Sequence, residues 1–444
     1  MLPRLAISIT TFKREAEVRD TVARLESFLA DFPYRDHIRL QVVDNGQSAN
    51  IQPSEITTPY ANPNLGGAGG FARGLIEAEA AGCSHCLFMD DDASFHMENI
   101  ARCYAFLTLA RDPNAALAGA MINTTVKWAM WENGAVFNTS CRPLHTGVDL
   151  RERDQLLDME FDSVHDDYPT LYGAWWFFAF PIAAARHYPF PFFVRGDDIS
   201  FSLANDFRIS TLNGVVSFQQ DFTEKESAQT LYLDLRNHLL HHLIFDSLSR
   251  SAVGTAWVAV LFIVRSLLRF HYSSAEAQLL ALQDVMQGPD FFDQNLDMAE
   301  RRARIRELAR DEEWQEIGTV DLSERHRVFS RLPAPIRHYF GLITINGHLA
   351  PFWSWLGSRP VLKIGQRGLV DESFGAARLT FLNTARDKAY ALPHSKRRFF
   401  AISWRLAGTL LRYLRIHRVL KDEYRDRYPN MTSRAYWEKA LDRR

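Results

Sequence analysis

The 444-residue chain lacks both a long hydrophobic run and the pattern of a secretory leader. Its longest apolar run, residues 252–264, is well short of the roughly 20 residues that a helix needs to cross a bilayer. The N-terminal residues lead directly into a strand-like run, so we expect no signal peptide. The sequence therefore predicts a protein that does not span a membrane.

Cysteine is scarce, and charge of one sign does not dominate. The four cysteines are Cys83, Cys86, Cys103 and Cys141, and the C-x-x-C pair at Cys83 and Cys86 has no second pair with which to complete a zinc site. We expect reduced thiols, as in a cytoplasmic protein. A formal net charge of −2 gives no general attraction to nucleic acid, so we expect no nucleic-acid partner.

The chain does have the composition of a folded globular protein, with 47% hydrophobic and 23% charged residues. A length of 444 residues exceeds what one hydrophobic core usually holds. Strand-like and helix-like segments alternate up to about residue 245, and helical periodicity then takes over. We therefore expect an α/β domain, residues 1–245, with a mostly parallel sheet flanked by helices, and a mainly α-helical region, residues 246–444.

A β-α-β unit opens the chain. Residues 5–11 and 38–43 are strand-like, and the apolar residues from Val18 to Leu29 have helical spacing. Asp44 follows the second strand, where its carboxylate can accept hydrogen bonds from a base or a ribose. The alternative, which Asp44 taken alone favours, is a side chain that closes its own turn.

A glycine-rich segment, residues 62–74, leads into the next helix. Its glycines let backbone N–H groups approach an anionic ligand at the helix N-terminus. The pattern from Gly67 to Ala72 also matches the dinucleotide fingerprint, with Asp90 at about the expected 20 residues further on, so an NAD-linked oxidoreductase is an alternative. Against it, residues 57–64 contain two prolines and are not expected to form the strand that the fingerprint requires.

Three consecutive carboxylates, Asp90, Asp91 and Asp92, end an apolar run typical of a buried parallel strand. Ligands of open α/β sheets bind beyond the carboxyl ends of such strands. Because side chains alternate along a strand, Asp90 and Asp92 face the same side. We predict that these two hold Mg²⁺ or Mn²⁺ together with the oxygens of a diphosphate. The alternative is a solvated acidic turn.

Two later motifs add candidate functional side chains. Trp175 and Trp176 are adjacent and cannot both face one core in an extended chain, so we expect one to line a groove and stack on a sugar. Packing of both in two layers is the alternative. Asp197 and Asp198 begin a helix-like segment. One acid suffices as a helix cap, so the other is a candidate general base for a hydroxyl.

The last region is basic. Between residues 396 and 421, lysines and arginines interleave with aromatic residues and leucines. This pattern predicts a helix that lies on an anionic membrane surface. A helix packed on the protein, with a solvated basic side, fits equally well.

Together these motifs resemble those of the family 2 glycosyltransferases of the GT-A fold, and most of all the bacterial galactofuranosyltransferases. The glycine-rich segment, the three aspartates, the two tryptophans and the later aspartate pair stand in the family's order, and the resemblance covers the chain up to about residue 240. It implies inverting transfer from a UDP-sugar, expected to be UDP-galactofuranose, to a lipid-linked glycan acceptor. The protein would then work peripherally, at the cytosolic face of the inner membrane.

The resemblance also implies residue roles. Asp90 and Asp92 would hold Mn²⁺ or Mg²⁺, which neutralises the departing UDP, and Asp198 would take the proton from the acceptor hydroxyl. Asp44 and Asn64 would hold the uridine, with Arg14 near the diphosphate. The substrate-binding set as a whole would be Arg14, Asp44, Asn64, Gly66, Gly67, Asp91, Trp175, Trp176 and Asp197.

The chain departs from the family pattern at Gln219, which stands where the family usually has a metal-binding histidine. An amide oxygen is a weaker ligand than imidazole, so the metal could be held loosely or by another group. Two alternatives follow. One is the same fold with another donor, such as UDP-galactopyranose or a dTDP-sugar, and the other is a weakly active carbohydrate-binding relative.

Overall fold

The computed structural model describes residues 2–92, 94–165, 168–219, 226–327 and 333–442. Its central element is an eight-stranded sheet of order β11-β5-β10-β4-β1-β2-β3, with β6 added beside β5. Pairing is parallel except at β10 and β6. This confirms the predicted α/β class. The strands are β1 (Leu5–Thr11), β2 (Ile38–Asp44), β3 (Thr57–Ala61), β4 (His85–Asp90), β5 (Ala115–Asn123), β6 (Met130–Glu132), β10 (Phe177–Pro181) and β11 (Arg208–Gln219).

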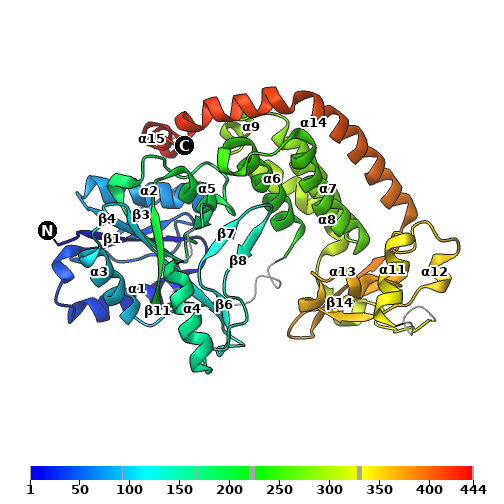
Figure 1. Ribbon diagram of the computed structural model, residues 1–444, viewed down its shortest axis with the longest axis horizontal. Coiled ribbons are helices and arrows are strands. Elements are labelled where there is room, and N and C mark those ends of the chain that lie inside the picture. The colour runs from blue at the N-terminus through cyan, green and yellow to red at the C-terminus, as the bar shows by residue number, and fades with distance from the viewer. Residues whose placement is uncertain (1, 93, 166–167, 220–225, 328–332, 443–444) are drawn as a thin grey trace.

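Helices cover both faces of this sheet (Figure 1). On one face lie α1 (Glu15–Ala30) and α3 (Glu98–Leu109), and on the other lies α2 (Gly66–Ala80). Alternation along β1 explains the two layers, because Ile7 packs with α1 and α3 whereas Ala6 packs with α2. Further elements around the sheet are α4 (Arg153–His165), α5 (Asp197–Ala204) and a small sheet of β7 (Ala135–Phe137), β8 (Cys141–Pro143) and β9 (Leu171–Tyr172).

Helix α2 approaches β1 closely because glycines face the strand. A Cβ atom on Gly70 would lie 2.2 Å from Thr10 Cγ2, and one on Gly74 would lie 1.9 Å from Ser8 Oγ. The helix already begins at Gly66, so these two glycines serve helix packing. Only the start of the predicted glycine-rich loop is therefore available to a ligand.

The expectation that residues 57–64 form no strand is wrong, because β3 occupies Thr57–Ala61. Strand β3 is the edge of the sheet and pairs only with β2, so Pro59 is tolerated there although it lacks an N–H group. The argument against a dinucleotide fingerprint that rested on this segment falls. A second observation still argues against it: the fingerprint needs a single ribose-binding acid, whereas this chain has three in a row, Asp90, Asp91 and Asp92.

A second core is built from helices. It contains α6 (Ala228–Ile244), α7 (Ala252–Leu268), α8 (Tyr272–Val285), α9 (Asp290–Gln294), α10 (Ala299–Leu308) and one face of the long α14 (Lys396–Met431). The predicted helices of this region are thus confirmed. Among the described residues, no helix has both the length and the apolar character needed to cross a bilayer.

Elements from the two sides of residue 245 pack against each other. Helix α6 precedes that residue but packs in the second core. Helix α14 arches over the helices (Figure 1), and the following α15 (Arg434–Asp442) returns to α2. There Trp437 is fully buried, and Arg434 pairs with Glu79 at 2.7 Å.

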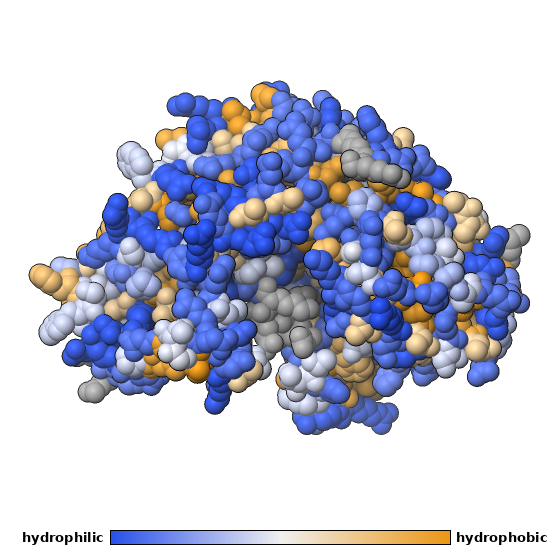
Figure 2. Space-filling model, turned by 180° about the vertical axis from the view of Figure 1, so that it is seen from behind, coloured by the Kyte–Doolittle hydropathy of each residue, from blue (hydrophilic) through white to orange (hydrophobic). Residues whose placement is uncertain are grey.

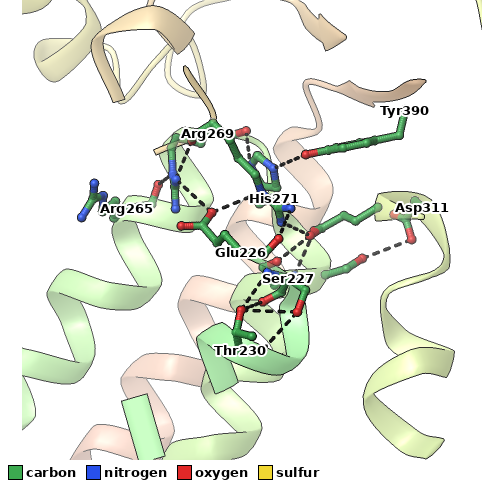
Figure 3. Close-up of polar contacts among 12 residues, drawn as sticks. Glu226, Ser227, Thr230, Arg265, Arg269, His271, Asp311 and Tyr390 are labelled. Carbon is green, nitrogen blue, oxygen red and sulfur yellow. Dashed lines mark hydrogen bonds and ion pairs between the residues drawn. The ribbon is translucent and has the colours of Figure 1, made fainter. Parts of the chain in front are cut away.

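A small sheet within the C-terminal region is not foreseen by the helical periodicity. Its order is β12-β15-β14-β13, and short helices accompany it. A polar contact joins it to the helices (Figure 3): His271 Nε2 lies 3.3 Å from Tyr390 Oη of β15. The elements are β12 (Gln315–Glu316), β13 (Val361–Lys363), β14 (Arg378–Leu382), β15 (Lys388–Pro393), α11 (Ala334–Ile343), α12 (Trp353–Leu356) and α13 (Val370–Ser373).

Candidate active site

A cavity of about 920 Å³ opens at the carboxyl-terminal edge of the central sheet. This is the place at which open α/β sheets bind their ligands. Helices α6, α7 and α10 also contribute to its wall, so both parts of the chain form it. It brings together these predicted site residues: Arg14, Asn64, Gly66, Gly67, Asp90, Asp91, Trp175, Trp176, Asp197 and Asp198. Among the described residues that line it, Asp44 and Asp92 do not occur.

One guanidinium group joins two members of the aspartate triplet. Arg14 Nη1 donates to Asp91 Oδ1 at 2.9 Å, and Arg14 Nη2 donates to Asp92 Oδ2 at 2.8 Å. Asp91 also accepts a hydrogen bond from Thr11 Oγ1 at 2.8 Å. Burial nevertheless raises the pKa of Asp91 to about 6, against the opposing effect of Arg14. The charge of Arg14 thus compensates part of the negative charge of Asp91 and Asp92.

Asp90, at the end of β4, faces the end of β11. Its Oδ2 atom accepts a hydrogen bond from Gln219 Nε2 at 3.3 Å. Gln219 therefore contacts one of the two carboxylates predicted to hold the metal. Among the described residues, no three His, Cys, Asp or Glu side chains converge to hold an ion unaided. Mg²⁺ is commonly held by one or two carboxylates plus substrate phosphates. Asp90 lines the cavity, whereas Asp92 lies outside its lining and is bonded to Arg14, so Asp90 is the better placed of the two predicted ligands.

The start of α2 forms a tight glycine turn. Gly66 has φ +72°, and a Cβ atom there would lie 2.0 Å from the carbonyl oxygen of Phe193. The Gly66 N–H donates to Asn64 Oδ1 at 3.2 Å, and the Ala68 N–H donates to Phe193 O at 3.2 Å. The turn is therefore seated against the segment that leads to Asp197.

Asp44 closes the turn after β2. Its carboxylate accepts hydrogen bonds from the N–H groups of Gly46 at 2.9 Å and Ala49 at 2.7 Å. The next residue, Asn45, lines the cavity and donates to Gly66 O at 3.0 Å. The sequence analysis missed Asn45. Its position directly after an apolar strand was the available signal.

Asp197 and Asp198 begin α5, and both line the cavity. Burial raises the pKa of both carboxyl groups, and the charge of Asp198 raises that of Asp197 further. Two buried carboxyl groups this close together favour a state in which the pair holds one proton.

Glu132, at the end of β6, is an acid for which the sequence predicted no role. It is 7% exposed and lines the cavity. Burial, together with the charge of Asp198, raises the pKa of Glu132 to about 8. A protonated carboxyl group in a cavity can donate a hydrogen bond to a ligand oxygen. In the sequence, Glu132 could have been identified as a site residue only from its position as an acid within an aromatic stretch.

The adjacent tryptophans pack in two layers. Trp175 is buried against Phe71 and Phe88, with ring centroids 4.8 and 5.2 Å apart. Trp176 is half-buried on the opposite face of the sheet, and its Nε1 atom donates to Gly119 O at 2.8 Å. Both also line the cavity. The two tryptophans therefore pack in the core and also line the cavity in which a ligand would lie.

Comparison with known proteins gives two curated relatives, and no protein-family model matches the chain. Galactofuranosyltransferase GlfT2 of Mycolicibacterium smegmatis is 26% identical over 316 residues, which cover 64% of this chain and 48% of that protein. GlfT2 of Mycobacterium tuberculosis is 26% identical over 315 residues, with the same coverage. The chain thus spans about half the length of the curated relatives it matches.

Solved structures were compared as well. Mannosyltransferase PcManGT from Pyrobaculum calidifontis, in complex with GDP-Man and Mn²⁺, is 15% identical with a TM-score of 0.37, covering 63% of this chain and 75% of that one. TarS 1–349 of S. aureus is 15% identical with a TM-score of 0.31, covering 68% and 92%. The resemblance indicated by the motifs is confirmed by the two GlfT2 sequences, and the chain is related to bacterial galactofuranosyltransferases.

Proposed function

We propose that this protein transfers galactofuranose from UDP-galactofuranose to a glycan acceptor, with inversion at the anomeric carbon. The observation that carries the proposal is the single cavity in which the glycine turn of α2, Asp90 and Asp91, and Asp197 and Asp198 meet. The relationship to galactofuranosyltransferases supports the choice of sugar.

We place the two substrates in different parts of the cavity. Asn45, Asn64 and the start of α2 would contact the nucleotide, with Arg14 near the diphosphate. Mn²⁺ or Mg²⁺ held by Asp90 and Asp92 would neutralise charge on the departing UDP. Asp198 would accept the proton of the acceptor hydroxyl as its oxygen attacks from the face opposite UDP.

A donor panel tests this proposal. With an acceptor galactoside, we expect UDP-galactofuranose to give a kcat/KM at least about tenfold above those of UDP-galactopyranose and dTDP-sugars, a difference of about 1.4 kcal/mol. Product is measured by mass spectrometry. A higher kcat/KM with another donor would establish the alternative donor. Absence of turnover with every donor, together with metal-independent UDP binding, would identify a carbohydrate-binding relative.

We also propose that the protein acts on a lipid-linked acceptor while bound peripherally to the cytosolic face of a membrane through α14. One face of this helix, including Ile402 and Tyr413, packs on the helical core. The opposite face exposes Phe400, Trp404 and Leu411 among its arginines. Hydrophobic and hydrophilic side chains alternate along the upper edge of the molecule in Figure 2, where α14 runs in Figure 1. Such a mixture suits an anionic interface.

Vesicle cosedimentation tests this surface. We expect binding to phosphatidylcholine vesicles that contain about 30% phosphatidylglycerol, and little binding to phosphatidylcholine alone. Trp404, 81% exposed, has the largest exposed fraction among the large hydrophobic side chains of α14. Trp404→Ser should weaken binding about tenfold, whereas Trp128→Ser, at an exposed site far from α14, should not. Equal weakening by both substitutions, or equal binding to both vesicles, would contradict the assignment.

A further inference from the structure

Helix α6 buries polar side chains against residues 192–196, the segment that leads into Asp197. Arg236, Asn237 and His241 are 1%, 0% and 0% exposed, although the helix is otherwise largely apolar. Buried polar groups of this kind need hydrogen-bond partners. All three find partners on the backbone of residues 192–196, and Arg236 donates in addition to the side chains of Asn237 and Met298.

Each carbonyl oxygen from residue 192 to residue 196 accepts a hydrogen bond from outside the segment or from α5. Arg236 Nη2 donates to Phe192 O at 2.5 Å, and the Ala68 N–H of the glycine turn donates to Phe193 O at 3.2 Å. Asn237 Nδ2 donates to Val194 O at 3.1 Å and to Arg195 O at 2.5 Å. His241 Nε2 lies 3.0 Å from Gly196 O, which can only accept.

The segment has a backbone that needs such support. Phe193, Arg195 and Gly196 have φ of +73°, +69° and +74°. The left-handed region is unfavourable for residues with a Cβ atom, and Phe193 and Arg195 both have one. Such a conformation persists only where the surroundings determine it. Here the hydrogen-bond donors of α6 hold the backbone in this conformation. The direction in which the segment then runs sets where α5 begins.

The amide of Asn237 is itself fixed in orientation. Arg236 Nε donates to Asn237 Oδ1 at 2.9 Å, which leaves Nδ2 facing the two carbonyl groups. The Arg236 guanidinium in turn lies 4.8 Å from the ring centroid of Phe292. The pair therefore forms a rigid donor set on α6.

We infer that Asn237, oriented by Arg236 and assisted by His241, is a positioning residue that holds the segment of residues 192–196 in place, with Phe193, Arg195 and Gly196 in their left-handed conformation. In doing so it directs Asp198 into the cavity and seats the same segment on the glycine turn of α2. The role in turnover rests on the proposed function. The conformational role does not, and it can be measured without substrate.

Two variants and one control test the inference. Asn237→Ala removes the donor, and Asn237→Asp keeps the shape but places a carboxylate against two carbonyl oxygens. His242→Ala is the matched control, because His242 is also fully buried on α6 but bonds to Leu248 O instead. Hydrogen exchange measured by mass spectrometry on peptides covering residues 193–200 should quicken at least about tenfold in both Asn237 variants and not in the control.

Kinetics provide the second readout. We expect kcat for galactofuranose transfer to fall about a hundredfold in Asn237→Ala, with the donor KM within about threefold, because a misplaced base affects turnover more than donor binding. Unchanged exchange in residues 193–200 would overturn the inference, as would faster exchange with a wild-type kcat. Inactivity of the wild type with every donor would overturn the proposed function alone, since exchange still decides the conformational role. Should Asn237→Ala not fold, Arg236→Lys, which loses the bond to the amide, gives the same test.

Discussion

Asp198→Asn is expected to lower kcat for galactofuranose transfer about a thousandfold while leaving the affinity for UDP within about twofold. Asp198 lies at the start of α5 and lines the cavity, and burial raises the pKa of its carboxyl group to about 6. An amide of the same shape cannot accept the proton of the acceptor hydroxyl. Initial rates of transfer and calorimetric titration with UDP measure the two quantities.

The neighbouring aspartate gives the matched control for this substitution. Asp197 is buried beside Gly67, and burial together with the charge of Asp198 raises its pKa, which favours the protonated form that an amide resembles. Asp197→Asn should therefore keep kcat within about tenfold of the wild type. Turnover of Asp198→Asn at the wild-type rate would remove Asp198 from the mechanism. A greater loss in Asp197→Asn would exchange the two roles.

The pH dependence follows from the same carboxyl group. A base must be ionised, so kcat/KM of the wild type should rise with pH through about 6 and then level off. Asp198→Asn should lose this rise. If the pH profile of Asp198→Asn keeps this rise, another group causes it. The candidate is then Asp91, whose pKa is raised to about 6.

The parts of the fold that the sequence predicts are those set by local pattern. Strand β1 spans the predicted residues 5–11, and Asp90 ends β4 as expected, because a buried parallel strand is an apolar run with clear ends. Strand β3 was missed because Pro59 argues against a strand unless the edge position is known. The short strands near the C-terminus carry too few residues to show a period.

The sequence predicted the site mainly through residues that stand at the end of a strand or at the start of a helix. Asp90, Asp197 and Asp198 do so, and the fold gathers them in one cavity. Glu132 and Asn237 owe their importance to partners far away in sequence, such as Asp198 for the former and Arg195 O for the latter. Such pairings arise from tertiary packing, which no window of the sequence contains.

Removal of divalent ions is expected to lower the transfer rate at least about a thousandfold, and added Mn²⁺ to restore it. A nucleotide diphosphate must approach three consecutive carboxylates, and Arg14, which could meet the diphosphate, is already bonded to two of them, Asp91 and Asp92. Repulsion between these acids and the diphosphate is severe in a partly buried site unless a further cation intervenes. Transfer assays after EDTA treatment, followed by titration with Mn²⁺ or Mg²⁺, measure the requirement.

Gln219 decides how tightly that ion is held. Because imidazole is a better ligand than an amide oxygen, Gln219→His should lower the Mn²⁺ concentration for half-maximal rate about tenfold. Gln219→Ala is the control. It removes the bond to Asp90 Oδ2 without adding a ligand, so it should leave that concentration unchanged or raise it. Full transfer in EDTA would contradict the metal site itself. An unaltered Mn²⁺ requirement in Gln219→His would place the ion beyond the reach of β11, so that Asp90 and Asp92 bind it with the diphosphate alone.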